Sequence, residues 1–152
     1  MHGYDYSYFW NTLENLKQIP QIRQMDQYIQ HGQVTCLCHC IAVAYLSYRI
    51  CRALRMRVDY DSLIRGAMLH DFFLYDWHDP DPSHKWHGFR HPLTAYRNAS
   101  RLFRLTPIEQ DIICSHMWPL TLRHMPHHRE AAVICLADKI CSLRETVEGL
   151  VA

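Results

Sequence analysis

The sequence predicts an all-α protein, and three observations support this fold class. Apolar residues recur at three- and four-residue spacings through most of the chain, and no stretch alternates regularly enough to predict a strand. Helix-start signals separate these periodic segments. The 152 residues contain no internal repeats, low-complexity tracts or flexible linkers. We therefore expect one domain over residues 1–152, with a helical extension at 1–34 and a core at 35–147.

In the first half of the chain, four helices are expected: at about 8–16, after Pro20 up to residues 31–32, at 35–57, and from 59 or 61 to 71. Pro20 precedes the second helix, and His31-Gly32 is its expected stop. Thr35 has a typical N-cap side chain and is expected to open the long third helix. Either Asp59 or Asp61 can cap the fourth helix in the same way.

In the second half, a loop is expected at 75–90, because this stretch carries two prolines, a glycine and three aspartates. Loops of this length tend to be functional. His91-Pro92 is expected to begin a helix, with proline at its first position. Thr106 and Glu109 form a capping box, with Pro107 between them, for a helix that runs through His116. A last helix is expected at about 128–147.

Composition narrows the class of protein. The hydrophobic fraction of 49% and the net charge of +1 are ordinary for a soluble protein and disfavour a nucleic-acid polymer as partner. The longest apolar runs, at 40–46 and 131–137, are too short to span a membrane, and no signal peptide is recognisable. Seven cysteines without a regular spacing indicate reduced thiols. We therefore expect a cytoplasmic protein that does not bind membranes.

Histidine is the unusual component, with 12 copies. His39, His70, His116 and Asp138 each share a helical face with apolar residues, so all four are expected to point inward. A single inward histidine is more often a hydrogen-bonded core residue than a ligand. An inward carboxylate without a partner, however, costs several kcal/mol. Asp138, together with Asp71 next to His70, therefore indicates a buried cation.

The expected ligands combine imidazole and carboxylate without thiolate: His39, His70, Asp71, His91, His116 and Asp138. This donor set favours Fe, Mn, Co, Ni or Zn over Ca, and makes Mg a weaker candidate. One or two divalent ions are feasible. In the arrangement with two ions, His91 and His116 hold the second one, and Asp71 bridges it to the first. Two ions ~3.5–4 Å apart can activate a water and bind a phosphoryl group together.

This ordered series resembles the HD-domain metal-dependent phosphohydrolases over about residues 35–145. The pair Asp138-Lys139 is similar to the family's last ligand and the basic residue after it, and His91 and His116 resemble the two extra histidines of its two-metal members. The resemblance implies about six to seven helices around a central metal site, and hydrolysis of phosphate mono- or diesters, commonly of nucleotides. The chain resembles in particular the small bacterial members that act on dinucleoside polyphosphates. Met117 and the absence of a Gly-Tyr-Pro segment distinguish it from the branch that acts on cyclic dinucleotides.

The corresponding mechanism is a hypothesis in which a metal-bound hydroxide attacks phosphorus. Asp71 would hold the metals, and Lys139 and Arg90 would offset the phosphate charge. His87, four residues before His91, is the loop histidine placed to act as proton donor or substrate contact. His78 and His84 are expected to be solvated.

Two alternatives from other classes remain open on the sequence. The same ligand series resembles that of HD-domain di-iron oxygenases, which use dioxygen, although their substrate-clamping basic residues are not identifiable here. A catalytically idle domain that senses a nucleotide or a metal is the second alternative. The substrate expected first is a small phosphate ester, in particular a nucleotide, and the sequence does not predict the oligomeric state.

Overall fold

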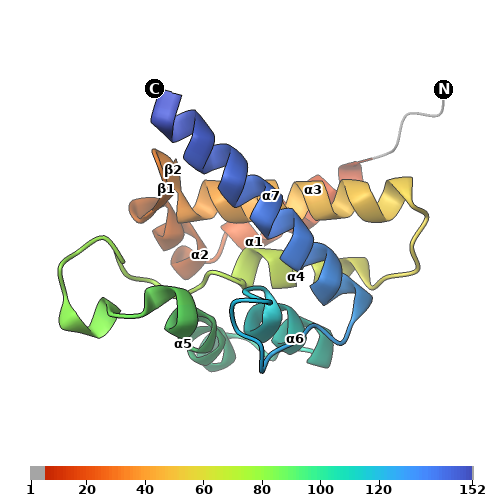
Figure 1. Cartoon of the computed structure of the whole chain (residues 1–152). Helices are drawn as coiled ribbons and strands as arrows, with labels where there is room; N and C mark the ends of the chain where they lie inside the picture. The colour runs from red at the N-terminus through yellow and green to blue at the C-terminus, as the bar shows by residue number, and fades with distance from the viewer. Residues whose placement is uncertain (1–5, 152) are drawn as a thin grey trace.

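Seven α-helices account for most of residues 6–151, the part of the chain that the computed structural model describes (Figure 1). They are α1 (Ser7–Lys17), α2 (Pro20–Gln24), α3 (Cys36–Ala53), α4 (Tyr60–Leu69), α5 (His87–Leu102), α6 (Pro107–Ser115) and α7 (Arg129–Val151). The all-α prediction is confirmed. Residues 1–5 and 152, which the single-domain prediction includes, lie outside the described part.

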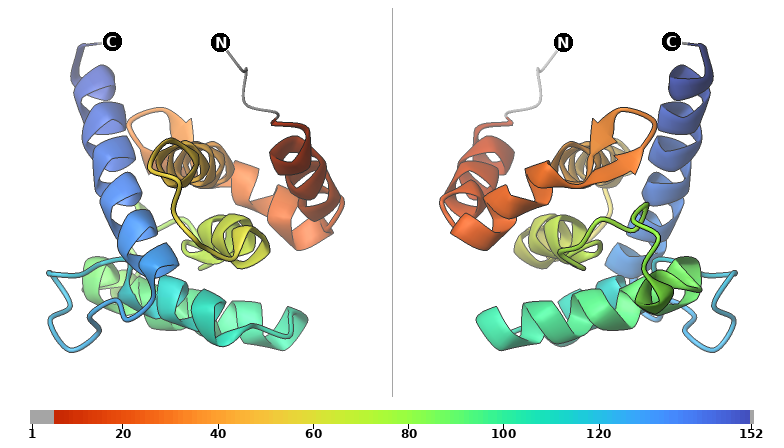
Figure 2. Two further views of the ribbon diagram at one scale, coloured as in Figure 1. Left: turned by 90° about the vertical axis from the view of Figure 1, so that its right-hand side faces the viewer. Right: turned by 90° about the vertical axis from the view of Figure 1, so that its left-hand side faces the viewer.

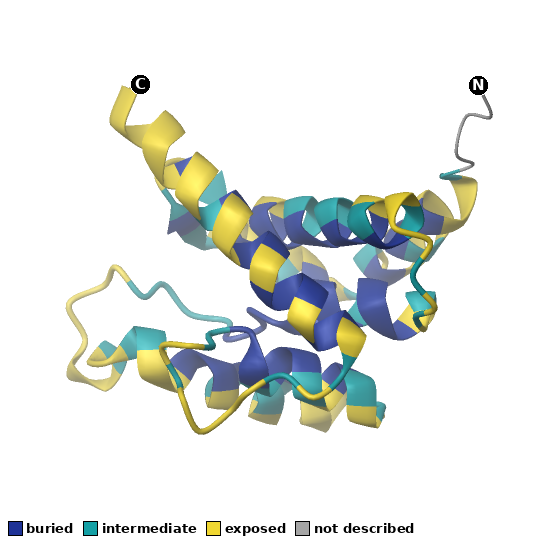
Figure 3. Cartoon of the chain, turned by 45° about the vertical axis from the view of Figure 1, so that its right-hand side comes forward, coloured by how far each residue is buried: buried dark blue, intermediate teal, exposed yellow. Residues whose placement is uncertain are grey.

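The helices surround a core at the centre of the domain. α3 packs against α4 and α7, while α6 packs against α4, α5 and α7. Figures 1 and 2 show α7 crossing α3 obliquely and α5 and α6 forming a layer at the lower side. Buried residues concentrate where α3, α4, α6 and α7 meet, and the outer face of α7 and the long loops are exposed (Figure 3). None of the helices within residues 6–151 has the length and apolar character of a membrane span.

The expected helix starts are confirmed where a side-chain cap predicts them. The Thr35 hydroxyl accepts a hydrogen bond from the Cys38 N–H at the start of α3. Asp59, and not Asp61, caps α4 by accepting from the Ser62 N–H. Both hydrogen bonds of the capping box between Thr106 and Glu109 are present at the start of α6. Each such cap is worth ~1 kcal/mol and fixes where the helix begins.

The prediction of a helix up to residue 32 is wrong after Gln24. A short 3-10 helix (Met25–Gln27) follows α2, and a hairpin of β1 (Ile29–His31) and β2 (Val34–Thr35) precedes α3. The turn of this hairpin contains Gly32 with φ of 57°, a conformation that favours glycine. Strands of two and three residues are too short to produce a recognisable alternation, which is why the sequence did not predict them.

The bounds of three other helices also differ from the prediction. α5 begins at His87, so Pro92 lies inside the helix and not at its first position. The preceding loop is correspondingly shorter than 75–90 and contains a 3-10 turn at Pro82–His84. α3 ends at Ala53, ahead of the left-handed Arg55 with φ of 52°, and α7 continues to Val151. The earlier start of α5 changes which side chains face the centre, as described below.

Candidate metal centre

The structure brings all six predicted ligands together at the buried junction of five helices. They come from α3 (His39), the C-terminal end of α4 (His70 and Asp71), α5 (His91), the C-terminal end of α6 (His116) and α7 (Asp138). Each is at most 6% exposed. Polar side chains with this degree of burial require partners, because their hydration is lost on folding.

Four of these side chains form the first group, in which His39, His70, Asp71 and Asp138 meet. Asp138 Oδ1 lies 3.0 Å from His39 Nε2 and 3.6 Å from His70 Nε2. Asp71 Oδ2 lies 3.6 Å and 3.4 Å from the same two nitrogens. Two carboxylate oxygens and two imidazole nitrogens thus converge on one point.

The second group joins the same aspartate to the two remaining histidines. Asp71 Oδ1 lies 3.1 Å from His91 Nε2 and 3.4 Å from His116 Nε2, and the two nitrogens are 2.8 Å apart. The Asp71 carboxylate therefore has one oxygen in each group. This is the geometry of a bridging carboxylate, with its two oxygens aimed at two neighbouring positions.

Hydrogen bonds on the outer ring nitrogens determine the tautomers. The Nδ1 atoms of His70, His91 and His116 lie 2.6, 2.9 and 2.8 Å from the backbone carbonyl oxygens of Ala67, His87 and Ile113. A carbonyl oxygen can only accept, so each Nδ1 carries the hydrogen and donates it. In the neutral ring, Nε2 is then a lone pair directed into the cluster. Buried metal-ligating histidines have this same arrangement.

Protons can neutralise only part of this cluster. Burial by itself lowers the pKa of the His39 imidazole, but hydrogen bonds with Asp138 and Glu145 raise it to about 9. The neighbouring Asp71 and Asp138 raise the pKa of His70 in the same way against its burial. Burial lowers the pKa of His116, so that this ring stays neutral, and its Nε2 faces that of His91. Two lone pairs at this distance repel unless a cation lies between them or beside them.

The donor set fits a divalent metal. Within the described residues, His70 Nε2 and Asp71 Oδ1 are buried and have no hydrogen-bond partner, although both are directed at the cluster. A buried acceptor without a partner costs about 1–3 kcal/mol, and more when it is charged. A cation in the first group would satisfy His70 Nε2, and one in the second group would satisfy Asp71 Oδ1. Two groups of three or four ligand atoms that share Asp71 provide for one ion or two.

A cavity of about 710 Å³ opens onto the cluster. Asp71, His91, His116 and Asp138 line it on one side, while its other walls are largely apolar and include Trp77, Met117, Pro119 and Leu120. A volume of this size accommodates a small organic ligand. The candidate metal centre is therefore accessible from a site that can bind a substrate.

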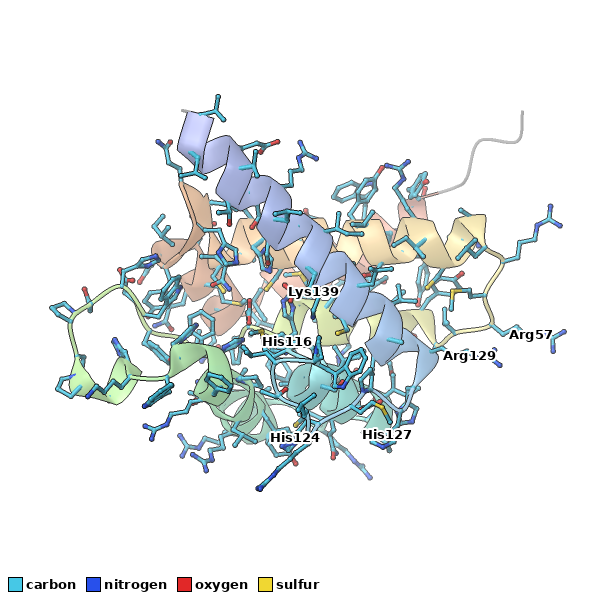
Figure 4. The ribbon with its side chains drawn as sticks, in the orientation of Figure 1. Arg57, His116, His124, His127, Arg129 and Lys139 are labelled. Carbon is cyan, nitrogen blue, oxygen red and sulfur yellow. The ribbon has the colours of Figure 1, made fainter. Side chains whose placement is uncertain are left out.

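Of the three predicted accessory residues, two line this cavity and one does not. His87 lies beside His91 with the rings stacked, and its Nδ1 is 2.7 Å from the Tyr75 hydroxyl. Lys139 also lines the cavity, but its ammonium donates to the carbonyl oxygens of His116 and Cys135. Figure 4 shows Lys139 just above His116 at the centre of the domain. The exposed Arg90 instead lines a separate cavity.

Three residues beside the cluster did not emerge from the sequence. Gln30 of β1 donates from Nε2 to Asp71 Oδ2 over 2.6 Å. Glu145 of α7 accepts from His39 Nδ1 over 2.8 Å, and His31 lies against the His39 ring. The position of Glu145, seven residues after Asp138 and thus on the same helical face, is the signal that could have identified it. Gln30 and His31 lie on the unpredicted hairpin and had no such signal.

Two of the loop histidines have partners within the loop, and the cysteines form no disulfide. His78 is exposed and pairs with Asp76, and the His84 ring contacts the carbonyl oxygen of Asp79. His124 and His127 lie at the lower edge of the domain, away from the cluster (Figure 4). All seven cysteines are free.

Comparison with protein families gives one match. The family described as HD domain matches residues 36–143, which is more than half of the chain and includes all six converging side chains. Comparisons with curated proteins and with solved structures give no match.

Proposed function

The chain belongs to the HD domain family, and from this premise we propose that it is a metal-dependent phosphohydrolase acting on small phosphate esters. The observation that carries the proposal is the set of converging imidazole nitrogens and carboxylate oxygens on the floor of a cavity. Their tautomers are fixed from outside, and two of the atoms lack any other partner among the described residues. When bound here, a divalent ion supplies Lewis-acid polarisation of a phosphoryl oxygen and lowers the pKa of a water.

The chain's own residues hold this chemistry in place. Asp71, shared between the two ligand groups, holds them at a fixed separation, and Asp138 closes the first group from the side of α7. Both carboxylates stay ionised, because the surrounding histidines keep their pKa values low in spite of burial. The two carboxylates are therefore ready to bind a cation at neutral pH, whereas His39 and His70, whose pKa values are raised, release a proton when a cation binds.

His87 is suited to donate a hydrogen bond more than to transfer a proton. Burial and the neighbouring His91 lower the pKa of its imidazolium to about 3, so the ring is neutral at pH 7. The Tyr75 hydroxyl can donate to His87 Nδ1, which leaves the ring hydrogen on Nε2. From the cavity wall, this N–H can bind a phosphoryl oxygen. We propose this role in place of the general acid that the sequence suggested.

The cavity walls favour a substrate with few charges. Among the described residues that line the cavity, Lys139 is the only lysine or arginine, and its ammonium already binds backbone carbonyls. Trp77, Met117, Pro119 and Leu120 provide an apolar surface for a ring such as a nucleobase. We therefore propose a mononucleotide or a similar monophosphate as substrate. Dinucleoside polyphosphates, with their larger charge, are expected to be poorer substrates.

The free thiols of all seven cysteines support a reducing compartment, and the cytoplasm is the proposed location. We propose that the protein acts on small molecules and not on a nucleic-acid polymer, because the cavity of about 710 Å³ matches a small ligand and the net charge is only +1.

The test is phosphate release from a panel of mononucleotides, dinucleoside polyphosphates and sugar phosphates by protein loaded in turn with Mn²⁺, Co²⁺, Zn²⁺ or Fe²⁺. We expect turnover of monophosphates that a chelator abolishes and that Asp71→Asn removes. Release that persists in the presence of the chelator contradicts the proposal. Oxygen uptake without phosphate release supports the oxygenase alternative, and tight nucleotide binding without turnover supports the sensor alternative.

A further inference from the structure

Two segments outside the family match, the β1–β2 hairpin and the last turns of α7, pack on each other. The contact is made by two glycines, since a Cβ placed on Gly149 would lie 3.0 Å from the Gly32 Cα. Gly32 itself lies in the turn of the hairpin with φ of 57°. Figures 1 and 2 show the hairpin beside the C-terminal part of α7. The hairpin position is therefore set by a backbone contact with no room for a side chain.

This hairpin presents Gln30 to the candidate metal centre. Gln30 is 5% exposed, and its Nε2 lies 2.6 Å from Asp71 Oδ2. Two oxygens would repel each other at this distance, so the amide nitrogen must face the carboxylate and donate. Within the described residues, Gln30 Oε1 is buried and has no hydrogen-bond partner. The bond to Asp71 is thus the main polar contact of this side chain.

The bond determines the orientation of the Asp71 carboxylate. Rotation about the last torsion of an aspartate is soft, and the two oxygens can take many orientations when nothing holds them. In the structure, Oδ2 faces His39 and His70 while Oδ1 faces His91 and His116. Only in this orientation does Asp71 reach both ligand groups, and a hydrogen bond to Oδ2 selects it.

We propose that Gln30 is a positioning residue that holds Asp71 as the bridge between two metal ions, and that the Gly32–Gly149 contact keeps Gln30 in place. This inference rests on the proposed metal centre and concerns its occupancy. Gln30 also lines the cavity, but the effect proposed here is exerted through its hydrogen bond to Asp71. A loss of Gln30 should therefore weaken the second ion far more than the first, because the first keeps His39, His70 and Asp138.

The experiment compares Mn²⁺ binding to the wild-type chain and to Gln30→Met, which keeps the side-chain volume and removes the donor. Titration against a competing chelating dye gives the stoichiometry and the two affinities. Electron paramagnetic resonance reports whether two Mn²⁺ ions are spin-coupled, and unchanged affinity for the first ion shows that the fold around the centre is intact. Gln33→Ala, at an exposed position of the same hairpin, is the matched control. Thermal unfolding of the metal-free proteins compares their folds.

We expect the second Mn²⁺ to bind Gln30→Met about 10- to 100-fold more weakly, the typical effect of losing a residue that orients a ligand. The coupled signal should give way to that of isolated ions, and Gln33→Ala should behave as wild type. Two coupled ions bound to Gln30→Met with unchanged affinity would overturn the inference alone. A wild-type chain that binds no Mn²⁺ or other divalent metal would overturn the proposed function as well.

Gly149→Ala is an independent second variant, remote from every ligand. Alanine is the better helix former, so on helix propensity alone the substitution stabilises α7 and leaves metal binding unchanged. If the glycine contact positions Gln30, the added methyl group displaces the hairpin and weakens the second Mn²⁺ in the same direction as Gln30→Met. Unchanged binding of the second ion by Gly149→Ala would overturn the part assigned to the glycine contact.

Discussion

The two ends of α3 are held in place by different forces. In its C-terminal half, Tyr45 and Tyr48 pack against Phe9 of α1, with ring centroids 5.7 and 5.3 Å apart and Phe9 fully buried. Near its N-terminal end, the equally buried His39 faces Asp71, Asp138 and Glu145. The aromatic contacts are favourable in the protein as it stands. The polar cluster is favourable only when its charges and lone pairs are matched.

The contrast explains how one helix can contribute both to stability and to function. Burial of aromatic rings supplies stability that depends on no ligand, and it anchors the helix that carries His39. The cluster at the other end concentrates groups that would otherwise avoid a protein interior. We therefore expect variants at the two ends to separate stability from metal binding.

The largest expected effect follows from Asp71→Asn. The amide is similar in size but loses the charge that both ligand groups share. Loss of the Lewis acid, worth several kcal/mol, should lower kcat/KM about a thousandfold or more. The rate of phosphate release from a monophosphate substrate measures this fall in kcat/KM. Unaltered turnover at saturating metal would contradict the role of Asp71.

Phe9→Ala should have a large effect on the stability of the fold and none on metal affinity. It removes a fully buried ring that packs against Tyr45 and Tyr48, and it should reduce the free energy of unfolding by about 3–5 kcal/mol. Urea unfolding of the metal-free protein measures this. Because Phe9 packs at the far end of α3, metal affinity of the folded fraction should not change, and a strong loss of affinity would mean that the two ends are coupled.

Metal addition should stabilise the wild-type chain by an intermediate amount. At 100 times Kd, binding to the native state alone contributes ~2.7 kcal/mol. For a chain of this length, that amount raises Tm by about 5–10 °C. Scanning calorimetry with and without Mn²⁺ gives the shift. Phe9→Ala should show the same increase from a lower starting value, and Asp71→Asn should show a smaller increase, because only His39, His70 and Asp138 remain for the first ion.

The smallest effect is expected at Asp111 of α6, which binds the residues just before α7. Asp111 accepts hydrogen bonds from the backbone N–H groups of His127 and His128 and contacts the His128 ring at 2.8 Å. Burial raises the pKa of Asp111, but these contacts lower it below its ordinary value. The ionised carboxylate therefore stabilises the fold above its unfolded pKa of ~3.9, and this contribution is lost as pH falls through the lower folded value.

Asp111→Ala should accordingly cost about 1–2 kcal/mol at pH 7. The difference from wild type should shrink as pH falls below ~4. Urea unfolding of both proteins across this range tests the sign. A difference that grows on acidification would contradict the assignment, and metal affinity at pH 7 should be the same in both.

The sequence predicted both the helices that carry strong caps and the six converging side chains, for two different reasons. Thr35, Asp59 and the Thr106–Glu109 box act within a few residues, so local sequence determines them. Asp138 was recognised because a carboxylate on an apolar helical face needs a partner, and this physical requirement does not depend on knowing the fold.

The features that the sequence missed depend on tertiary packing. The hairpin is fixed by the close approach of Gly32 to Gly149, more than a hundred residues away. The spacing of apolar residues along the sequence does not indicate that contact. Arg90 was expected at the site as a group that offsets phosphate charge. α5 begins at His87, however, so Arg90 is one helical position away from His91 and faces a different side. Gln30 became recognisable only after the hairpin placed it beside Asp71.

The most direct test of the central claim is a crystal structure of Mn²⁺-loaded protein, with data collected for anomalous scattering. We expect one anomalous peak among His39, His70 and Asp138, a second beside His91 and His116, and the Asp71 carboxylate between them. Well-ordered crystals that show no peak at this junction, or only one at a different set of side chains, would contradict the account.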